Sequence, residues 1–491
     1  MSDRHRHISL KKLGVVLFLL NCFSCSPVYS ANHMPDTSLR VAEQIEAIIQ
    51  QSVPTANVGI VLEEAKTGRV LYERLSAKPF CPASNVKLLT AAASLLSLGS
   101  DYRFKTVIKI ENKALQQGKL LGNVFIEFNG DPSLTILDFK ELLSGLKKAG
   151  IRQITGDIVI DNTRFEKPNY APGWTWDSLP WYYTAPVTAV ILNENYISLI
   201  VRGNKTTGKK AQISFVDGNE GKIKVISELV SVSEFAANNE CQIQAEMNDQ
   251  NDLSLKGCWP YQTQATTLSF AIKNPDLYAT RLIIEVLKSE NIELMGKVII
   301  GKAPLNLKII ASHESKPLTE LLKEVLRESN NIYADSLFKT LGAEKFQYGT
   351  FQAGTRAIQA VLAKPTGIRF ADLRIVDGSG ASRYNLVAPQ DFARLLLTMY
   401  HDNKVGKDFI NALPSSGDEN GNLRYRMGSA DLKDKIRAKT GTLLGISALA
   451  GYLSVHDKDF IVVIAIDHAL QNGEYLKHVE DELCRVLVNF D

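Results

Sequence analysis

The sequence predicts an α/β (α+β) protein in which the two ends of the chain build one helix-flanked sheet around a β-rich insertion. Residues 36–50 carry an apolar stripe with helical spacing, and the apolar runs 58–62 and 70–72 are typical of two strands joined by a turn at residues 66–69. Near the other end, residues 448–466 are typical of two strands and residues 474–488 of a helix. Between these ends, residues 101–275 consist mostly of short β-rich runs broken by Gly, Asn and Asp.

The remaining elements are consistent with this order. Residues 82–93 open a strongly apolar helix, which we expect to be buried because no polar face is left for solvent. The strands expected in the insertion are residues 107–110, 124–128, 158–160 and 197–201. Helical periodicity returns in residues 277–290, 318–341 and 389–400. A chain of 491 residues is too long for one core, so two or three domains are expected.

Charge and composition exclude two classes of function. Lys+Arg 56 and Asp+Glu 53 nearly cancel, and without residues 1–30 the balance is neutral. A neutral chain without runs of Lys and Arg lacks the electrostatic footprint of a nucleic-acid binder. The eight His are scattered, and no Cys and His cluster has the spacing of a zinc site. We therefore predict no metal and no cofactor.

Residues 1–30 have the pattern of a secretory signal peptide. Basic residues precede the apolar run 13–20, and small residues stand before Ala31. That run is about half the length of a membrane-spanning helix, and no later segment reaches about 20 uncharged apolar residues, so no permanent transmembrane anchor is predicted. Cys22 and Cys25 are candidate lipid-attachment sites, but the residues before them suit that modification poorly, and a lipid anchor is not expected.

Four cysteines lie outside the signal, and two of them are close in sequence. Cys241 and Cys258 flank a polar loop, and export to an oxidising compartment would allow them to form a disulfide. The alternative is a pair of buried thiols.

Ser84 and Lys87 form a candidate nucleophile and base. On a helix, positions three apart project from the same face, which brings the hydroxyl and the amine within hydrogen-bonding reach. A lysine kept neutral by burial takes the proton of the serine, and the N–H groups of the helix start favour the developing negative charge. The pattern alone is weak, because it recurs at Ser9/Lys12, Ser144/Lys147 and Ser336/Lys339. Ser84 differs in opening a buried helix with two further motifs downstream.

The two downstream motifs are Ser329-Asn330-Asn331 and Lys439-Thr440-Gly441-Thr442. The first lies at a turn between predicted helices, where a hydroxyl and a carboxamide can face a cleft; the alternative is an ordinary polar turn. The second precedes the terminal strands, where Lys supplies charge, Thr hydroxyls bind a carboxylate and Gly allows close approach of a substrate backbone. A second Lys-Thr-Gly, residues 66–68, lies in a predicted hairpin turn and is interpreted as a structural connector.

In this order, the three motifs resemble those of penicillin-binding proteins and active-site serine β-lactamases. Residues 377–385 and 130–134 narrow the resemblance to the low-molecular-mass class C penicillin-binding proteins, the D-alanyl-D-alanine carboxypeptidase/endopeptidases of the penicillin-binding protein 4 type. The resemblance implies a serine β-lactamase/transpeptidase-like domain with an antiparallel sheet, formed by residues 31–100 and 276–491. Residues 101–275 would then be one or two nested β-rich domains, and the exported chain would act in the periplasm.

The resemblance also implies a role for each motif residue. Ser84 would attack the carbonyl of the penultimate D-alanine, with Lys87 as general base and Ser329 relaying the proton. Asn331 would hold Lys87 and the substrate amide, and Lys439 would assist electrostatically. The oxyanion hole would be the backbone N–H groups of Ser84 and Thr442, and the substrate-binding residues would be Thr440, Gly441 and Thr442.

Two further residues are implied in recognising the free end of a diaminopimelate side chain, namely Arg383 and Asp177. For Asp177, the alternative is a surface turn beside packed aromatic residues. One departure from the family pattern is Asn330, where many relatives carry Asp. That side chain should point away from the nucleophile and affect catalysis little.

The implied partners are peptidoglycan peptides ending in D-Ala-D-Ala and β-lactams, which would acylate Ser84. Three alternatives remain: a serine β-lactamase, an esterase on the same scaffold, and a non-catalytic scaffold that binds peptidoglycan. The first lacks a deacylation motif at a matching place, and the last would usually have lost one of the motif side chains, all of which are intact. The balance between carboxypeptidase and endopeptidase action and the oligomeric state stay open.

Overall fold

The computed structural model describes residues 36–111, 115–216, 221–261 and 264–488. The predicted signal peptide, with Cys22 and Cys25, lies outside the described residues. Within the described ranges, no helix combines the length and the apolar character needed to cross a bilayer. No group of three or more His, Cys, Asp or Glu side chains in these ranges is arranged to hold a metal ion.

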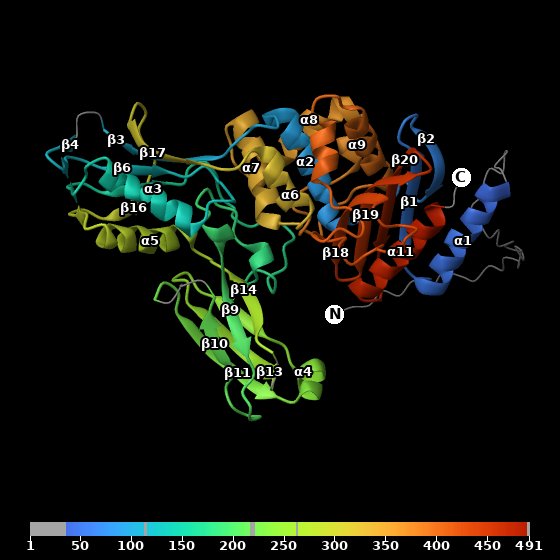
Figure 1. Cartoon of the computed structure of the whole chain (residues 1–491), viewed down its shortest axis with the longest axis horizontal. Coiled ribbons are helices and arrows are strands. Elements are labelled where there is room, and N and C mark those ends of the chain that lie inside the picture. Colours follow the sequence, from blue (N-terminus) through green and yellow to red (C-terminus); the bar gives the residue numbers. More distant parts are fainter. Residues whose placement is uncertain (1–35, 112–114, 217–220, 262–263, 489–491) are drawn as a thin grey trace, which may run out of the picture.

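The two ends of the chain share one antiparallel sheet, here called the main sheet (Figure 1). Its strand order is β18 (Ile436–Leu443), β19 (Ile446–Val455), β20 (Lys458–Asp467), β1 (Asn57–Glu64) and β2 (Arg69–Arg74). Residues 65–68, including the second Lys-Thr-Gly, form the turn between β1 and β2, as the sequence predicts. The fold class predicted from the resemblance, a helix-flanked antiparallel sheet, is confirmed.

Alternation along the strands decides which helices cover each face of the main sheet. Val58, Ile60 and Leu62 of β1 belong to the core formed with α1 (Asp36–Ser52) and α11 (Gly473–Val488), because successive strand residues point to opposite faces. On the other face packs α9 (Pro389–His401). Behind α9 lie the remaining helices of this domain, which pack on one another: α2 (Val86–Leu98), α6 (Leu318–Leu326), α7 (Asn331–Phe346), α8 (Phe351–Thr366) and α10 (Gly406–Ala412). The helix α2 is buried from Val86 to Leu95, as its apolar sequence predicts.

The insertion carries a second sheet that combines strands from both of its ends. Its order is β16 (Val298–Ile300), β8 (Ile158–Asp161), β6 (Val124–Glu127), β3 (Lys105–Ile110) and β17 (Lys308–Glu314). A smaller sheet contains β15 (Glu293–Leu294), β7 (Gln153–Ile154), β5 (Lys119–Leu120) and β4 (Leu115–Gln116). The helices α3 (Ile136–Lys148) and α5 (Pro275–Ser289) pack against each other beside these sheets.

The predicted boundary at residue 276 therefore differs from the strand pairing. The strands β15, β16 and β17 pair with β7, β8 and β3, so residues 275–314 return to the insertion before the chain rejoins the main domain. Helical periodicity identified α5 as a helix but carried no information about which sheet it covers. Strands of two or three residues also give too little alternation to be recognised.

A nested unit lies inside this insertion and projects away from the rest of the molecule (Figure 1). It contains two three-stranded sheets in the described residues: β10 (Gln212–Phe215), β9 (Tyr196–Arg202) and β14 (Thr266–Ala271), and β11 (Val225–Val232), β13 (Leu253–Pro260) and β12 (Gln244–Met247). The short helix α4 (Glu234–Glu240) leads into Cys241. Cys241 and Cys258 form a disulfide, the pairing suggested by the sequence.

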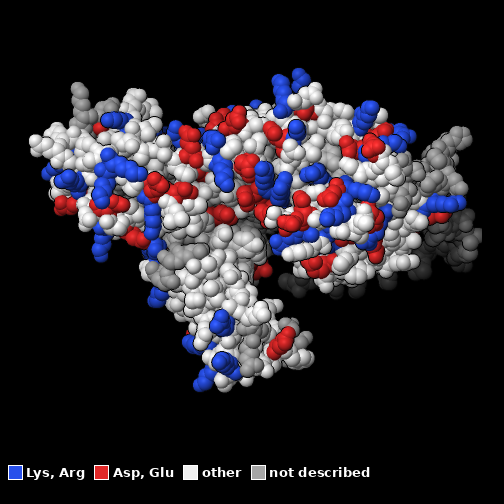
Figure 2. Space-filling view, in the orientation of Figure 1, with Lys and Arg blue, Asp and Glu red and all other residues white. Residues whose placement is uncertain are grey.

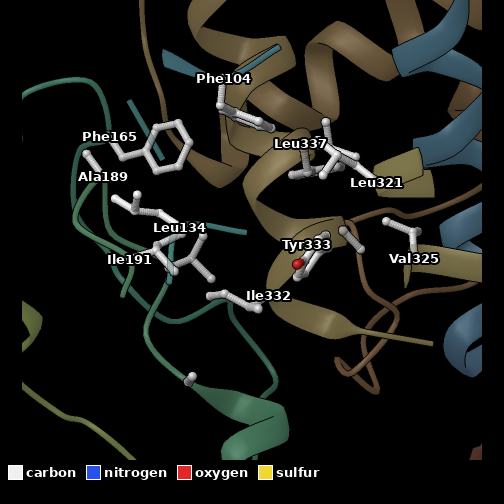
Figure 3. Close-up of a cluster of buried hydrophobic side chains, with 14 of the residues drawn as sticks. Phe104, Leu134, Phe165, Ala189, Ile191, Leu321, Val325, Ile332, Tyr333 and Leu337 are labelled. Atoms are coloured by element: carbon white, nitrogen blue, oxygen red, sulfur yellow. The ribbon is translucent and has the colours of Figure 1, made fainter. Parts of the chain in front are cut away.

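The insertion is fixed to the main domain through α7. Figure 3 shows Ile332, Tyr333 and Leu337 of α7 facing apolar side chains of the insertion, among them Leu134, Phe165 and Ile191, within one continuous core. Lys339, on the same helix, is buried and donates to the carbonyls of Glu166, Pro168 and Val187 at 2.9–3.0 Å. In the Ser336/Lys339 repeat of the Ser-x-x-Lys pattern, the lysine thus has a structural role, because it bonds the main domain to the insertion.

Candidate active site

Ser84 lies in a tight turn immediately before the buried helix α2. Before this turn, Phe80 forms an isolated antiparallel β-bridge with Val387. Ala83 has a φ of 45°, and Ala83–Asn85 form one turn of 3₁₀ helix. The helix α2 then begins at Val86. Ser84 is thereby presented at the N-terminal end of α2, where unpaired backbone N–H groups and the helix dipole favour negative charge.

Lys87 lies within hydrogen-bonding distance of three oxygens that come from different parts of the chain. Its Nζ is 2.9 Å from Ser84 Oγ, 2.6 Å from Asn331 Oδ1 and 2.6 Å from the carbonyl oxygen of Ser379. The side chain is completely buried. Burial lowers the pKa of Lys87, against the charges of Asp335 and Asp377, which act to raise it.

An ammonium group at Lys87 can donate to all three oxygens, and a neutral amine can keep the same three contacts. A neutral lysine has two N–H donors and one lone pair. If Asn331 Oδ1 and the Ser379 carbonyl, which can only accept, take the two N–H groups, the lone pair faces Ser84 Oγ. The arrangement therefore gives Ser84 a base that is already oriented toward its proton.

The second motif forms the turn between α6 and α7. Ser329 adopts a left-handed backbone with a φ of 61°, and Asn330 caps α7 by accepting from the backbone N–H of Tyr333. Asn331 is the first residue of α7, and its Nδ2 donates to the carbonyl of Tyr183 at 2.7 Å. Asn331 thus joins Lys87 to a loop of the insertion. Ser329 lies two residues from Asn331 and is partly exposed.

The third motif lies on β18, an edge strand of the main sheet that packs against the turn carrying Ser84. A Cβ atom at Gly441 would come within 2.8 Å of the Pro82 carbonyl and 3.0 Å of the Ser84 nitrogen. Only glycine allows this approach. Gly441 therefore lets β18 approach the backbone of Ser84, and Thr442 is the next residue along this strand.

Lys439 supplies a second buried amine to the site. Its Nζ donates to the carbonyl of Thr440 at 2.7 Å, and the side chain is fully buried. Burial lowers the pKa of Lys439 well below its usual value, and the nearby charge of Lys87 lowers it further. The site therefore contains two buried lysines of reduced proton affinity, Lys87 in contact with Ser84 and Lys439 within electrostatic reach of Lys87.

Arg383 and Asp177 are both exposed. They lie on two loops that are joined by hydrogen bonds. The Arg383 guanidinium donates to the carbonyl of Leu444, two residues beyond Thr442, at 3.2 Å. The loop before Asp177 is held by Trp174, whose Nε1 donates to Asp377 at 2.9 Å, and by a bond from Ser382 to the Pro172 carbonyl. The structure brings both loops to the rim of the site but shows no contact between these two side chains.

Sequence reasoning missed several groups that the structure places here. The carbonyls of Ser379 and Tyr183 cannot be recognised from residue type, because any residue supplies a carbonyl. Asp335 and Asp377 are buried beside Lys87, and only the second lay in a segment that the resemblance had singled out. The signal available for Asp335 was its place on the predicted helix, four residues after Asn331 of the second motif.

The comparisons with known proteins agree with this geometry. Residues 41–488 match the family model described as the D-Ala-D-Ala carboxypeptidase 3 (S13) family. The chain belongs to the S13 family. Among curated S13 relatives, D-alanyl-D-alanine carboxypeptidase DacB of Haemophilus influenzae is 32% identical over 448 residues, 91% of each chain. The D-alanyl-D-alanine carboxypeptidase of Actinomadura sp. (strain R39) is 29% identical over 429 residues, 85% of this chain and 78% of the relative.

Solved structures place this S13 chain in the same fold. The crystal structure of penicillin binding protein 4 from Haemophilus influenzae superposes with a TM-score of 0.81 at 31% identity, covering 90% of this chain and 99% of that one. Its complex with a β-lactam gives a TM-score of 0.79 at 29% identity, covering 91% and 99%. The family resemblance stated from the motifs is confirmed.

Asn330 departs from the family pattern, and its surroundings give a physical reason. Its Nδ2 donates to Glu194 Oε2 at 2.7 Å. Glu194 is largely buried, and burial raises the pKa of its carboxyl group. An Asp at position 330 would place two carboxylates in contact, whereas an Asn offers a donor to the Glu. Asn330 thus bonds to the insertion through Glu194, and its orientation away from the nucleophile stays a prediction.

We expect Asn330→Asp to make the acylation of the protein pH-dependent in a new way. At low pH one of the facing carboxyl groups is protonated and the contact survives, whereas at higher pH both ionise and repel. The rate of penicillin acylation should fall by roughly tenfold above neutral pH, because the turn bearing Asn331 shifts. Adding Glu194→Gln should restore the rate. A pH profile unchanged from the parent would contradict the coupling.

Proposed function

We propose that this chain is a serine-type D-Ala-D-Ala carboxypeptidase and D,D-endopeptidase that acts on peptidoglycan in the periplasm after removal of residues 1–30. The proposal rests chiefly on the three contacts of Lys87, which join the nucleophile, the second motif and residues 377–385 in one buried cluster. Membership of the S13 family supports the substrate class. The signal pattern in residues 1–30 supports the compartment.

In the proposed acylation step, Ser84 Oγ attacks the carbonyl carbon of the penultimate D-alanine while its proton passes to Lys87. The oxyanion accepts hydrogen bonds from the N–H groups of Ser84 and Thr442. The proton then reaches the leaving nitrogen through Ser329, the peptide bond breaks, and D-alanine departs. For a crosslink, the leaving group is the amine of the neighbouring strand. Water then attacks the ester and regenerates Ser84.

The third motif binds the substrate in the proposed reaction. The hydroxyls of Thr440 and Thr442 grip the terminal carboxylate, and Lys439 contributes electrostatic stabilisation. Because β18 is an edge strand, an extended peptide can add to it through backbone hydrogen bonds. A β-lactam would occupy the same position and leave a slowly hydrolysed acyl group on Ser84.

The decisive experiment is fluorescent-penicillin labelling of the mature chain, followed by mass spectrometry of the modified peptide. The label should lie on Ser84 and disappear in Ser84→Ala. Ser144→Ala is the matched control, because Ser144 and Lys147 repeat the same pattern on α3 and should not matter. A folded chain that takes no label would favour the non-catalytic scaffold or a penicillin-blind esterase. Rapid turnover of a chromogenic cephalosporin would favour a β-lactamase.

We also propose that Arg383 and Asp177 recognise the free end of a diaminopimelate side chain. That end carries both an amino and a carboxylate group, which an acidic and a basic residue at one rim can bind together. Replacing both with Arg383→Gln and Asp177→Asn should lower kcat/KM for diaminopimelate-containing peptides by about tenfold. Hydrolysis of a simple D-alanyl-D-alanine peptide should change much less. Equal losses on both peptides would show that the two residues maintain the structure of the site and do not recognise diaminopimelate.

A further inference from the structure

Two fully buried carboxylates lie beside Lys87, and the proposed acylation step uses neither. Asp335 is on α7, and Asp377 opens the segment 377–385. Burial raises the pKa of Asp335, and the neighbouring charge of Asp377 raises it further. Asp335 Oδ2 is buried and accepts no hydrogen bond of normal length among the residues that the structure describes, while the Ser379 side chain lies close enough to act against the rise in pKa. A buried carboxyl group with a spare oxygen is costly to the fold, so its position calls for an explanation.

The other oxygen of Asp335 holds the backbone N–H groups that precede the carbonyl in contact with Lys87. Oδ1 accepts from the backbone N–H of Gly378 at 2.7 Å and from that of Ser379 at 3.0 Å. The carbonyl of Ser379 in turn lies 2.6 Å from Lys87 Nζ. From the opposite side, Thr90 Oγ1 donates to the Gly378 carbonyl at 2.8 Å. Asp335 is therefore one peptide unit away from an oxygen that orients the amine.

Close packing against α7 restricts the backbone position of residues 377–380. A Cβ atom at Gly378 would lie 2.5 Å from Phe338 Cβ and 2.8 Å from the Ala334 carbonyl, so the backbone runs directly against α7. Asp377 fixes the next turn by accepting from the N–H groups of Gly380 and Ser382 at 2.9 and 2.7 Å. The position of the Ser379 carbonyl thus depends on what α7 presents to it.

We propose that Asp335 is a positioning residue for the general base: its carboxylate holds the Ser379 carbonyl against the Lys87 amine, and its negative charge acts on the protonation of that amine. The inference rests on the proposed function, since it assigns Asp335 a part in the acylation of Ser84. Asp335 touches neither the nucleophile nor the substrate in this scheme. It acts through one peptide group and through its charge.

The charged neighbours fix the sign of the effect. Lys87 is subject to the charges of Asp335 on α7 and Asp377, and it acts in turn on Lys439 of β18. Asp335 is also coupled to Lys339, four residues further along its own helix. A negative charge at Asp335 favours the ammonium form of Lys87. Removing that charge lets Lys87 lose its proton at lower pH, so the base form is present over a wider range.

Two variants separate the charge from the hydrogen bonds. Asp335→Asn keeps an oxygen that accepts from Gly378 and Ser379 but has no charge, whereas Asp335→Ala loses both. The second-order rate of Ser84 acylation by fluorescent penicillin is measured from about pH 5 to about pH 10. For Asp335→Asn, the acidic limb of this profile should move down by about one pH unit with a nearly unchanged plateau. For Asp335→Ala, the plateau should fall roughly 100-fold.

Asp391→Asn is the matched control. Asp391 is another buried carboxylate, but it lies in the first turn of α9 and pairs with Arg394. Its replacement should leave the limb in place. A limb that does not move in folded Asp335→Asn, or a full plateau in Asp335→Ala, would overturn the proposal. Both results leave the Ser84 adduct intact, whereas failure of the proposed function means no adduct at all.

A measurement on the unsubstituted chain covers the case in which a variant does not fold. The sequence contains Asp-Gly at residues 217–218 and 377–378. In an NMR sample labelled with carbonyl-¹³C aspartate and ¹⁵N glycine, only the glycine amides of these two pairs are bonded to a ¹³C carbonyl and can be selected. Asp217→Glu removes the first signal and identifies the second. Because the Gly378 amide donates to Asp335, its chemical shift should titrate over the pH range of the acidic limb. A Gly378 signal that stays flat through that range would refute the coupling.

Discussion

Replacing Lys87 with alanine should lower the rate of acylation by penicillin at least about 1000-fold, to a level set by the remaining oxyanion contacts. The amine is the only basic group within 3 Å of Ser84 Oγ among the hydrogen bonds of the described residues. Its removal leaves Ser84 without this group to accept its proton. The rate should be measured by stopped-flow or gel-based labelling across pH.

The same measurement on the parent should show the rate rising with pH along a limb well below the usual lysine pKa of about 10.4. Burial lowers the pKa of Lys87, so the neutral base accumulates earlier than in an exposed lysine. The fold should survive in Lys87→Ala, because the variant removes a buried group whose charging opposes folding. A cooperative melting transition, which shows that the variant is folded, is the control, although the acceptors that Lys87 leaves unpaired should lower its midpoint. Unchanged labelling would remove Lys87 from the role of base.

Gly380→Ala should be among the most destructive substitutions of a single small residue in the molecule. Gly380 has a φ of +82°, and a Cβ atom there would overlap the carbonyl group of Ala83, the residue before the nucleophile. Backbone atoms must move to admit it, so we expect a loss of about 3 kcal/mol in the free energy of unfolding. Acylation should fall roughly 100-fold, because the displacement is transmitted to Ser84.

Gly150→Ala separates the clash from the backbone strain. Gly150 has a φ of +85°, but nothing lies within 4 Å of the position of a Cβ atom. It should lose only about 1 kcal/mol and keep its full acylation rate. Chemical denaturation gives the first quantity and penicillin labelling the second. Equal effects at the two glycines would show that strain alone, and not the contact with Ala83, limits position 380.

Local patterns were enough to predict most of the main domain. The continuous apolar runs of β1, β19 and β20 and the apolar sequence of α2 reflect how each element is buried, and those signals are contained in a few consecutive residues. The three motifs were recognised because their order is restrictive although each is weak. Ser84, Lys87 and Asn331 are indeed brought together. Their catalytic roles stay predictions.

What sequence could not supply depends on pairing between distant segments. The strands β15 and β16 are too short to be recognised from sequence and are evident only from their pairing with β7 and β8. For this reason the sequence placed the end of the insertion too early. Asp335 and Glu194 resemble ordinary surface acids until their burial is known. The Ser379 carbonyl, an acceptor for Lys87, leaves no trace in residue type.

The position of β1 within the main sheet also constrains when the molecule becomes active during its synthesis. This strand lies between β2 and β20, and Asn57 is bonded to Asp467, 410 positions later. Ser84 and Lys87 therefore leave the ribosome long before the strands β18 to β20 that complete their surroundings. A growing chain carries its serine without a partner strand for the substrate, so neither hydrolysis nor capture by a β-lactam can begin until translation is almost finished.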